Sequence, residues 1–132
     1  MKILKKLAVL GVLSTALIVT GCSDFERTSF QALSSSRDTI NQAQDDYEAP
    51  ATPEKPKKIP HNQCAYAVIN DAKAAQTVAV NAMVVYEEQK ATKQDLASQT
   101  ALAATAVSGL APLVVKVKTL YTNPAAACGG SK

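Results

Sequence analysis

The sequence predicts an all-α fold, a small helical bundle in which an Ala-rich antiparallel helical hairpin packs with an N-terminal helix. Fourteen alanines lie between Ala65 and Ala111, and alanine has the highest helix propensity of all residues. Neither glycine nor proline occurs from His61 to Ser108. Four of the six prolines gather instead between residues 49 and 60, where they predict a Pro-rich linker between the two helical parts.

The N-terminal residues have the features of an export signal. A basic segment, residues 1–6, precedes an uncharged apolar run from Leu7 to Thr20. This run is shorter than the roughly 20 apolar residues that a transmembrane helix needs. A basic start, a short apolar segment and a small residue at its end are typical of a cleaved signal peptide.

The junction Val19-Thr20-Gly21-Cys22 resembles the lipobox of bacterial lipoproteins. The resemblance implies a signal peptide over residues 1–21, cleavage before Cys22, and acyl chains on Cys22 that hold the protein on a membrane. In that family an aspartate directly after the acylated cysteine tends to retain the protein in the inner membrane. Ser23 occupies this position, which implies the outer membrane, facing the periplasm, although Asp24 follows. The alternative is an ordinary cleaved signal with an incidental cysteine.

The charge of the exported part argues against nucleic-acid binding. The chain has 14 basic and 11 acidic residues, but three of the lysines lie in the predicted signal peptide. The remainder is balanced at 11 of each sign. Proteins that bind nucleic acids carry a basic excess, so we expect no nucleic-acid partner.

The segment 22–48 is expected to form an amphipathic helix. Ser23 and Glu26 have the spacing of a capping box. The apolar residues that recur at helical spacing are Phe30, Leu33, Ile40 and Tyr47. The serines at 34–36 weaken the middle of the segment and are expected to favour a break there, because serine competes for backbone groups.

The segment 49–60 is expected to be a stiff, extended linker, because dense proline favours polyproline II. It also contains Lys55, Lys57 and Lys58. These lysines are candidates for binding a partner or anionic lipid head groups. The alternative is that the segment only connects two helical parts.

The segment 61–124 carries two apolar series. The first series is interrupted by Gln76 and contains Ile69, Ala72, Ala79, Met83 and Tyr86. The second series repeats every seven residues through Leu96, Ala103, Leu110 and Val117. A parallel set with the same spacing lies between these residues and contains Thr100, Val107, Val114 and Tyr121. Such spacing predicts helix packing but leaves open whether residues 62–108 form one helix or two. Pro112 is expected to kink or break the second series, and residues 125–132 are expected to be a tail.

The two cysteines of the exported part favour two helices. An even pair in an oxidising compartment indicates a disulfide, and a hairpin turning near residues 90–93 would bring Cys64 and Cys128 together. One continuous rod would hold them too far apart to bond. The alternative is a metal site with His61, but three ligands without paired spacing do not resemble structural zinc centres.

No catalytic motif stands out in the sequence. His61 is the single histidine, and no nucleophile motif lies near it. The acidic pairs Asp45-Asp46 and Glu87-Glu88 are expected to be solvated, since adjacent helical residues point to different sides. We therefore expect no catalytic residues, no metal and no cofactor.

Two functions are compatible with these features. The first is a lipid-anchored envelope module that binds or scaffolds a protein partner and is not an enzyme. The second is a protein that resembles the small outer-membrane lipoproteins of phage lysis systems, which join an inner-membrane partner across the periplasm. The long Ala-rich hairpin and its disulfide argue for the first.

Overall fold

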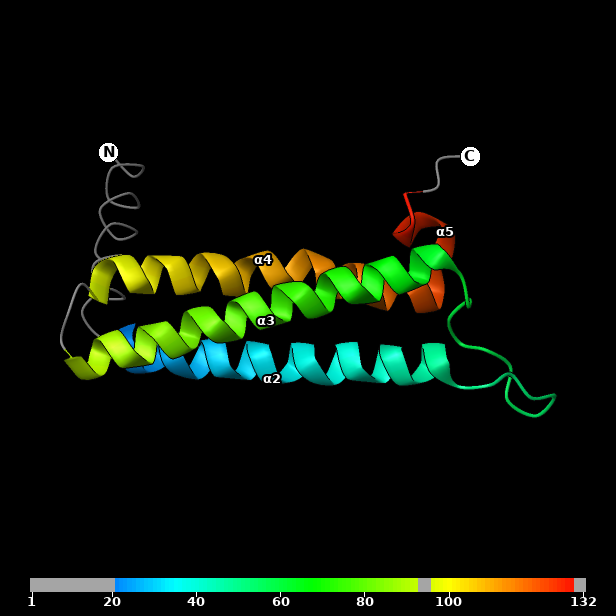
Figure 1. Ribbon diagram of the computed structural model, residues 1–132, viewed down its shortest axis with the longest axis horizontal. Coiled ribbons are helices and arrows are strands. Elements are labelled where there is room, and N and C mark those ends of the chain that lie inside the picture. The colour runs from blue at the N-terminus through cyan, green and yellow to red at the C-terminus, as the bar shows by residue number, and fades with distance from the viewer. Residues whose placement is uncertain (1–20, 93–95, 130–132) are drawn as a thin grey trace, which may run out of the picture. The chain divides into compact units, whose positions relative to one another are not determined.

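The predicted all-α fold is confirmed by a computed structural model, which describes residues 21–92 and 96–129. In these residues the helices are α2 (Gly21–Glu48), α3 (Gln63–Thr92), α4 (Leu96–Thr122) and α5 (Pro124–Ala127), and no strand occurs. The chain divides into residues 1–31 and residues 32–132, and the packing described below is that of the second unit. Figure 1 shows how α3 runs back alongside α4.

Helix α2 runs without a break from Gly21 to Glu48, so the predicted interruption at the serines 34–36 is wrong. The Ser36 hydroxyl donates to the carbonyl of Ala32 at 2.6 Å, four residues earlier. This bond keeps the serine side chain inside the helical pattern instead of competing with it. Leu33, Ile40 and Ala43 form the buried face of this helix, whereas Phe30 is half exposed.

Helices α3 and α4 are two separate antiparallel helices, as the cysteine argument predicted. Cys64, at the start of α3, and Cys128, after α5, are joined by a disulfide with a Cα–Cα distance of 5.9 Å. Asn62 caps α3, because its side-chain oxygen accepts the Ala65 backbone N–H at 2.8 Å in the usual N-cap geometry. The predicted turn residue Lys93 lies outside the described residues.

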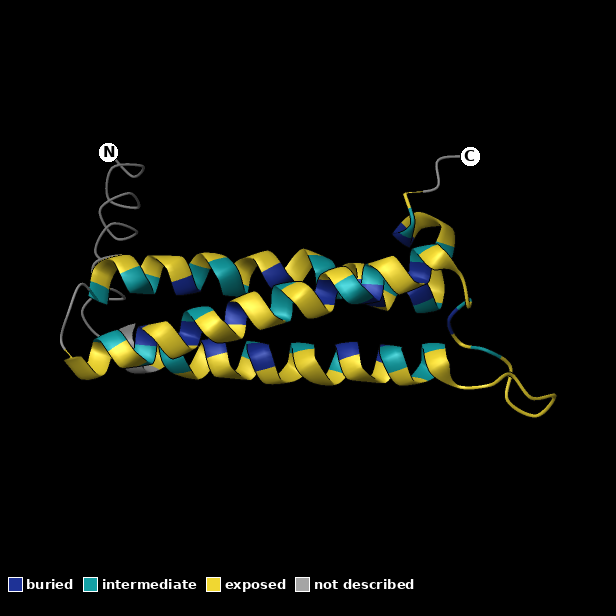
Figure 2. Ribbon diagram, in the orientation of Figure 1, coloured by how far each residue is buried: buried dark blue, intermediate teal, exposed yellow. Residues whose placement is uncertain are grey.

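The core of the second unit is narrow and built mainly from aliphatic side chains. Figure 2 shows its buried positions as a line of single residues along each helix rather than a broad band. The largest fully buried side chains are Tyr86, Ile40, Ile59, Met83, Leu110, Leu120 and Val117. Alanines at four further buried positions of α3 and α4 let the helices approach closely.

Pro112 does not break α4, which continues from Leu96 to Thr122, so of the predicted kink or break the break does not occur. Proline removes one helical hydrogen bond and leaves the carbonyl of Ser108 without its N–H partner. Both Ser108 and Pro112 are exposed, so water can reach this carbonyl. Leu110 and Val117 are buried on either side of Pro112, and their packing holds the helix together.

The segment after α4 is more ordered than the predicted tail. Asn123 caps α5 by accepting the Ala126 N–H at 3.2 Å, and Pro124 occupies its first turn, where proline is favoured. Ala127 is buried, and Cys128 follows directly. This short helix therefore brings the second cysteine to the start of α3.

Helix α4 is also the one helix in the described residues that is long and apolar enough to cross a membrane. Only 17% of its most apolar stretch is buried. Length and composition alone are weak evidence for a membrane span, because core helices of bundles share them. The low burial nevertheless leaves much apolar surface of α4 exposed.

Candidate functional site

The candidate site is the linker and the helix ends beside it, where the predicted binding lysines lie. Residues Thr52 and Lys55 exchange two backbone hydrogen bonds of 3.1 Å, so the linker makes a tight turn with Pro53 in it. The predicted extended conformation is therefore wrong for residues 52–55, because proline at this position favours a turn. Ile59 is fully buried and fixes the end of the linker to the bundle.

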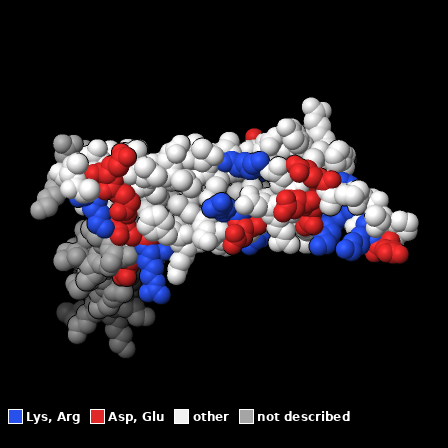
Figure 3. All heavy atoms as spheres, turned by 60° about the horizontal axis from the view of Figure 1, so that its bottom comes forward, with Lys and Arg blue, Asp and Glu red and all other residues white. Residues whose placement is uncertain are grey.

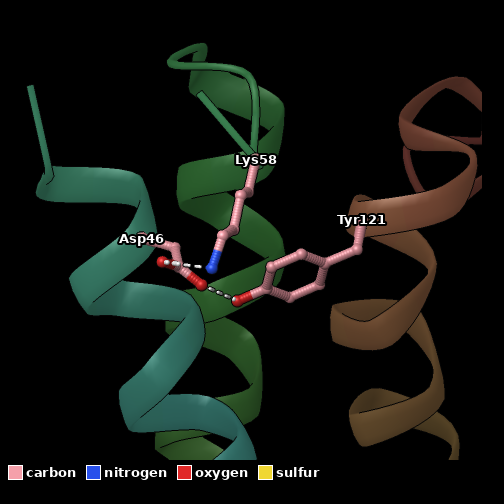
Figure 4. A network of polar contacts seen from close by, with 3 residues as sticks. All are labelled: Asp46, Lys58 and Tyr121. Carbon is pink, nitrogen blue, oxygen red and sulfur yellow. Dashed lines mark hydrogen bonds and ion pairs between the residues drawn. The ribbon is translucent and has the colours of Figure 1, made fainter. Parts of the chain in front are cut away.

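Asp46 is the centre of a polar network that joins the linker to two helices. Its carboxylate accepts a hydrogen bond of 2.7 Å from the Tyr121 hydroxyl and lies 3.8 Å from the Lys58 ammonium (Figure 4). Burial raises the pKa of Tyr121 above its usual value, and the hydrogen bond to Asp46 and its negative charge raise it further. The expectation that the Asp45-Asp46 pair is wholly solvated is thus wrong for Asp46.

Tyr47, at the end of α2, makes a second group of contacts. Its ring stacks on the His61 ring, with centroids 4.5 Å apart and an interplanar angle of 13°. The Lys57 ammonium lies 5.7 Å from the Tyr47 ring centre and donates to the Tyr47 carbonyl at 2.6 Å. Lys57 thereby supplies a donor to an otherwise free carbonyl at the end of α2.

A cavity of about 570 Å³ lies between the linker and the end of α2. Its lining is mixed in charge and consists of Asp46, Ala49, Pro50, Glu54, Lys55, Pro56, Lys57 and Lys58. Figure 3 shows the same mixture, with acidic and basic side chains close together around the linker. A pocket of this kind suits a polar partner segment carrying both charges better than a simple anion.

The three predicted binding lysines have different surroundings. Lys57 contacts Tyr47, and Lys58 pairs with Asp46. The backbone of Lys55 closes the turn with Thr52, and its side chain is exposed. Lys55 is thus the one of the three whose ammonium group makes no hydrogen bond or ion pair with the described residues.

A second cavity of about 340 Å³ lies between α2 and α3. Arg37 and Lys73 flank it, and Ile40 and Val80 supply its apolar surface. The Gln76 amide donates to the Leu33 carbonyl at 3.0 Å, while its buried oxygen accepts no hydrogen bond from the described residues. Gln76 thus ties α3 to α2 at the polar interruption of the first apolar series.

The other predicted site residues have the following positions. Cys22 lies in the first turn of α2, and the predicted signal peptide before Gly21 lies outside the described residues. His61 is exposed and stacked on Tyr47. In the described residues no group of three or more potential metal ligands occurs.

Sequence reasoning did not identify Asp46, Tyr47 or Tyr121 as members of this site. Asp46 and Tyr121 are 75 residues apart, and neither belongs to a motif. The only available signal was the apolar spacing that places Tyr47 and Tyr121 at the ends of their helices. Polar pairing across helices follows from the fold and not from local spacing.

No protein-family model matches this chain. Neither a curated protein nor a solved structure matches it.

Removing the Tyr121 hydroxyl tests whether the Asp46 network stabilises the fold. Tyr121→Phe is expected to lower the free energy of unfolding by about 1.5 kcal/mol at neutral pH, because a hydrogen bond to a charged acceptor is lost. The pKa of Tyr121 is higher folded than unfolded, so this contribution is fully present below about pH 10 and lost as the pH rises through the folded pKa. Urea unfolding at neutral and alkaline pH measures both effects.

The control for this variant is Tyr66→Phe, which removes the hydroxyl of an exposed tyrosine. It is expected to change stability little at either pH. Equal losses for the two variants would show that the bond to Asp46 does not stabilise the fold.

Proposed function

We propose that this protein is a lipid-anchored helical module that faces the periplasm from the outer membrane and binds or scaffolds an envelope protein. The observation that carries the proposal is the Val19-Thr20-Gly21-Cys22 junction after a basic and then an apolar segment. Acyl chains on Cys22 would hold the module at the membrane, and two or more chains are needed for stable anchoring. The module acts by binding and not as an enzyme.

The disulfide supports an extracytoplasmic location. Cys64 and Cys128 lie at opposite ends of the hairpin sequence but are bonded in the fold. Structural disulfides persist in oxidising compartments such as the periplasm and are rare in the cytosol. This agrees with export, which the N-terminal signal predicts.

The linker is the proposed surface for the envelope partner. Lys57 and Lys58 hold it to α2, and Ile59 fixes its end. Because the linker already has a defined conformation, it would lose less conformational entropy on binding a partner than a disordered segment would. Lys55 is exposed beside the mixed-charge cavity and is the lysine expected to contact the partner.

Cys22→Ala in the full chain tests the anchor and the partner together. The variant is expected to remain as an unlipidated precursor, to lose acyl labelling, and to lose crosslinks formed from a photoreactive residue at position 55 in native membranes. Ser23→Ala, one residue away, is the matched control and should be lipidated normally. Normal acyl labelling of Cys22→Ala would contradict the anchor, and a normally anchored protein without crosslinks at position 55 would contradict the linker surface.

A further inference from the structure

The outer side of the α3–α4 hairpin exposes apolar side chains that nothing in the described fold covers. Val78 is 61% exposed, Val85 39% and Leu102 60%. From Leu96 to Val115 helix α4 has no charged residue, and little of it is buried. Monomeric proteins seldom expose a long uncharged helical surface of this kind.

These exposed residues belong to two regular series. On α3, Asp71, Val78 and Val85 are seven residues apart, and on α4 the same spacing joins Leu102, Gly109 and Lys116. All six are exposed, and residues seven apart lie on one face of a helix. We call these six residues the outer seam.

The outer seam occupies equivalent flanks of the two helices. Each of its members directly precedes a buried residue of its own helix, the buried residues being Ala72, Ala79, Tyr86, Ala103, Leu110 and Val117. Lys73 and Val80 lie on the other side of the buried face of α3 and line the cavity shared with α2. The side of α3 that carries Val78 is therefore the side toward α4. Antiparallel helices are related by a local two-fold axis, so the equivalent flank of α4 is the one toward α3. Both halves of the seam therefore border the outer groove between α3 and α4.

The antiparallel register places the two halves of the seam at matching levels. The end of α3 at Thr92 and the start of α4 at Leu96 set this register. Counted seven residues from each of these ends, Val85 is level with about residue 103, beside Leu102. Counted fourteen residues from each, Val78 is level with about residue 110, beside Gly109. Counted twenty-one residues from each, Asp71 is level with about residue 117, beside Lys116.

We propose that a second copy of this chain packs on the outer seam and completes a four-helix arrangement of two α3–α4 hairpins. In this dimer the two copies are related by a two-fold axis parallel to the helices, so that α3 of one copy packs against α4 of the other. Neighbouring helices are then antiparallel, as in most four-helix bundles. Val78 of one copy then packs against Gly109 of the other, and Val85 packs against Leu102.

Gly109 and the flanking charges make the seam self-complementary. A Cβ atom built on Gly109 would meet no other heavy atom within 4 Å, so there is open space at Gly109 for Val78 of the second copy. Asp71 of each copy comes to the level of Lys116 of the other, which pairs opposite charges at both symmetric positions. Like charges would instead disfavour the association of two identical faces.

The surface is also large enough for a stable homodimer. The 20 uncharged residues from Leu96 to Val115 correspond to ~30 Å of helix. Two helices packed 8–10 Å apart present a face ~20 Å wide, or ~600 Å² in projection. Because accessible surface exceeds its projection, this face approaches the ~800 Å² per partner of a standard interface.

The mass of the full chain in mild detergent tests this proposal, by light scattering and native mass spectrometry. The wild-type chain is expected to be a dimer. Val85→Glu is expected to weaken association at least about tenfold, because a charge would be buried in the interface. Val84→Glu is the matched control, since Val84 is 50% exposed and lies outside the seam, and it should dimerise like the wild type. A monomeric wild type, or equal effects of the two glutamates, would overturn the proposal.

Charge reversal tests the two-fold pairing itself. Asp71→Lys and Lys116→Asp should each weaken the homodimer, because each places like charges opposite one another twice. When the two differently tagged variants are mixed, both charge pairs are restored and a heterodimer should form. An intrachain effect cannot produce this rescue. Failure of the mixed variants to copurify would overturn the pairing, as would binding of the seam to lipid vesicles by a chain that stays monomeric.

Discussion

Replacement of both Cys64 and Cys128 by serine is expected to lower the free energy of unfolding by ~4 kcal/mol. The bonded cysteines are 64 residues apart in sequence, so the disulfide closes a long loop and restricts the unfolded chain strongly. Small domains have a total stability of only about 5–15 kcal/mol. The melting temperature should therefore fall substantially, whereas much of the helical circular dichroism should remain at low temperature.

The same experiment has an internal control in the wild-type chain. Reduced wild-type protein should unfold like the double variant, because both lack the cross-link and keep the same helices. Non-reducing mass spectrometry of the exported protein should show one intramolecular bridge. Free thiols at both positions, or only intermolecular bridges, would contradict the disulfide and with it the sequence argument for a hairpin.

Tyr86→Ala is expected to have a similarly large effect on stability. Tyr86 is the largest fully buried side chain and is 0% exposed. Truncating a buried aromatic residue costs about 3–5 kcal/mol, because the lost packing leaves a cavity. In a core with so few large side chains this loss removes much of the available stability. Guanidinium unfolding of the purified chain measures it.

The matched control is Val84→Ala, two residues earlier on the same helix. Val84 is half exposed, so its truncation should change stability by no more than about 0.5 kcal/mol. If Tyr86→Ala unfolded at the same denaturant concentration as the control, the core around Tyr86 would not be packed as described.

Several local features of the helices could not be predicted from propensity alone. The serines at 34–36 and Pro112 are weak helix formers, and both lie within continuous helices. In the first case a side-chain bond from Ser36 to Ala32 accommodates the serine. In the second, packing of residues on both sides of the proline outweighs one lost hydrogen bond. Propensity is a weak prior because tertiary packing overrides it.

The candidate site was predictable only in part. The proline and lysine content marked the linker, and Lys55, Lys57 and Lys58 lie in it. Their roles differ because Tyr47 and Asp46, on α2, take two of the three as partners. Tyr121 reaches the same carboxylate from a helix 75 residues away. Neither contact has a signal in local spacing, so both had to come from the fold.

The helical class, the division at the prolines and the antiparallel hairpin all followed from the amino-acid sequence. Alanine content, apolar spacing and the two cysteines are sufficient for these, because helix propensity and loop closure depend on residue type and position along the chain. Which residues of each helix remain exposed, and which polar groups meet, followed only from the packing of the helices. Exposure depends on how three helices share a narrow core. Val78 and Val85 are apolar residues, yet both remain exposed once the helices are packed, because no neighbouring helix in the described fold covers them.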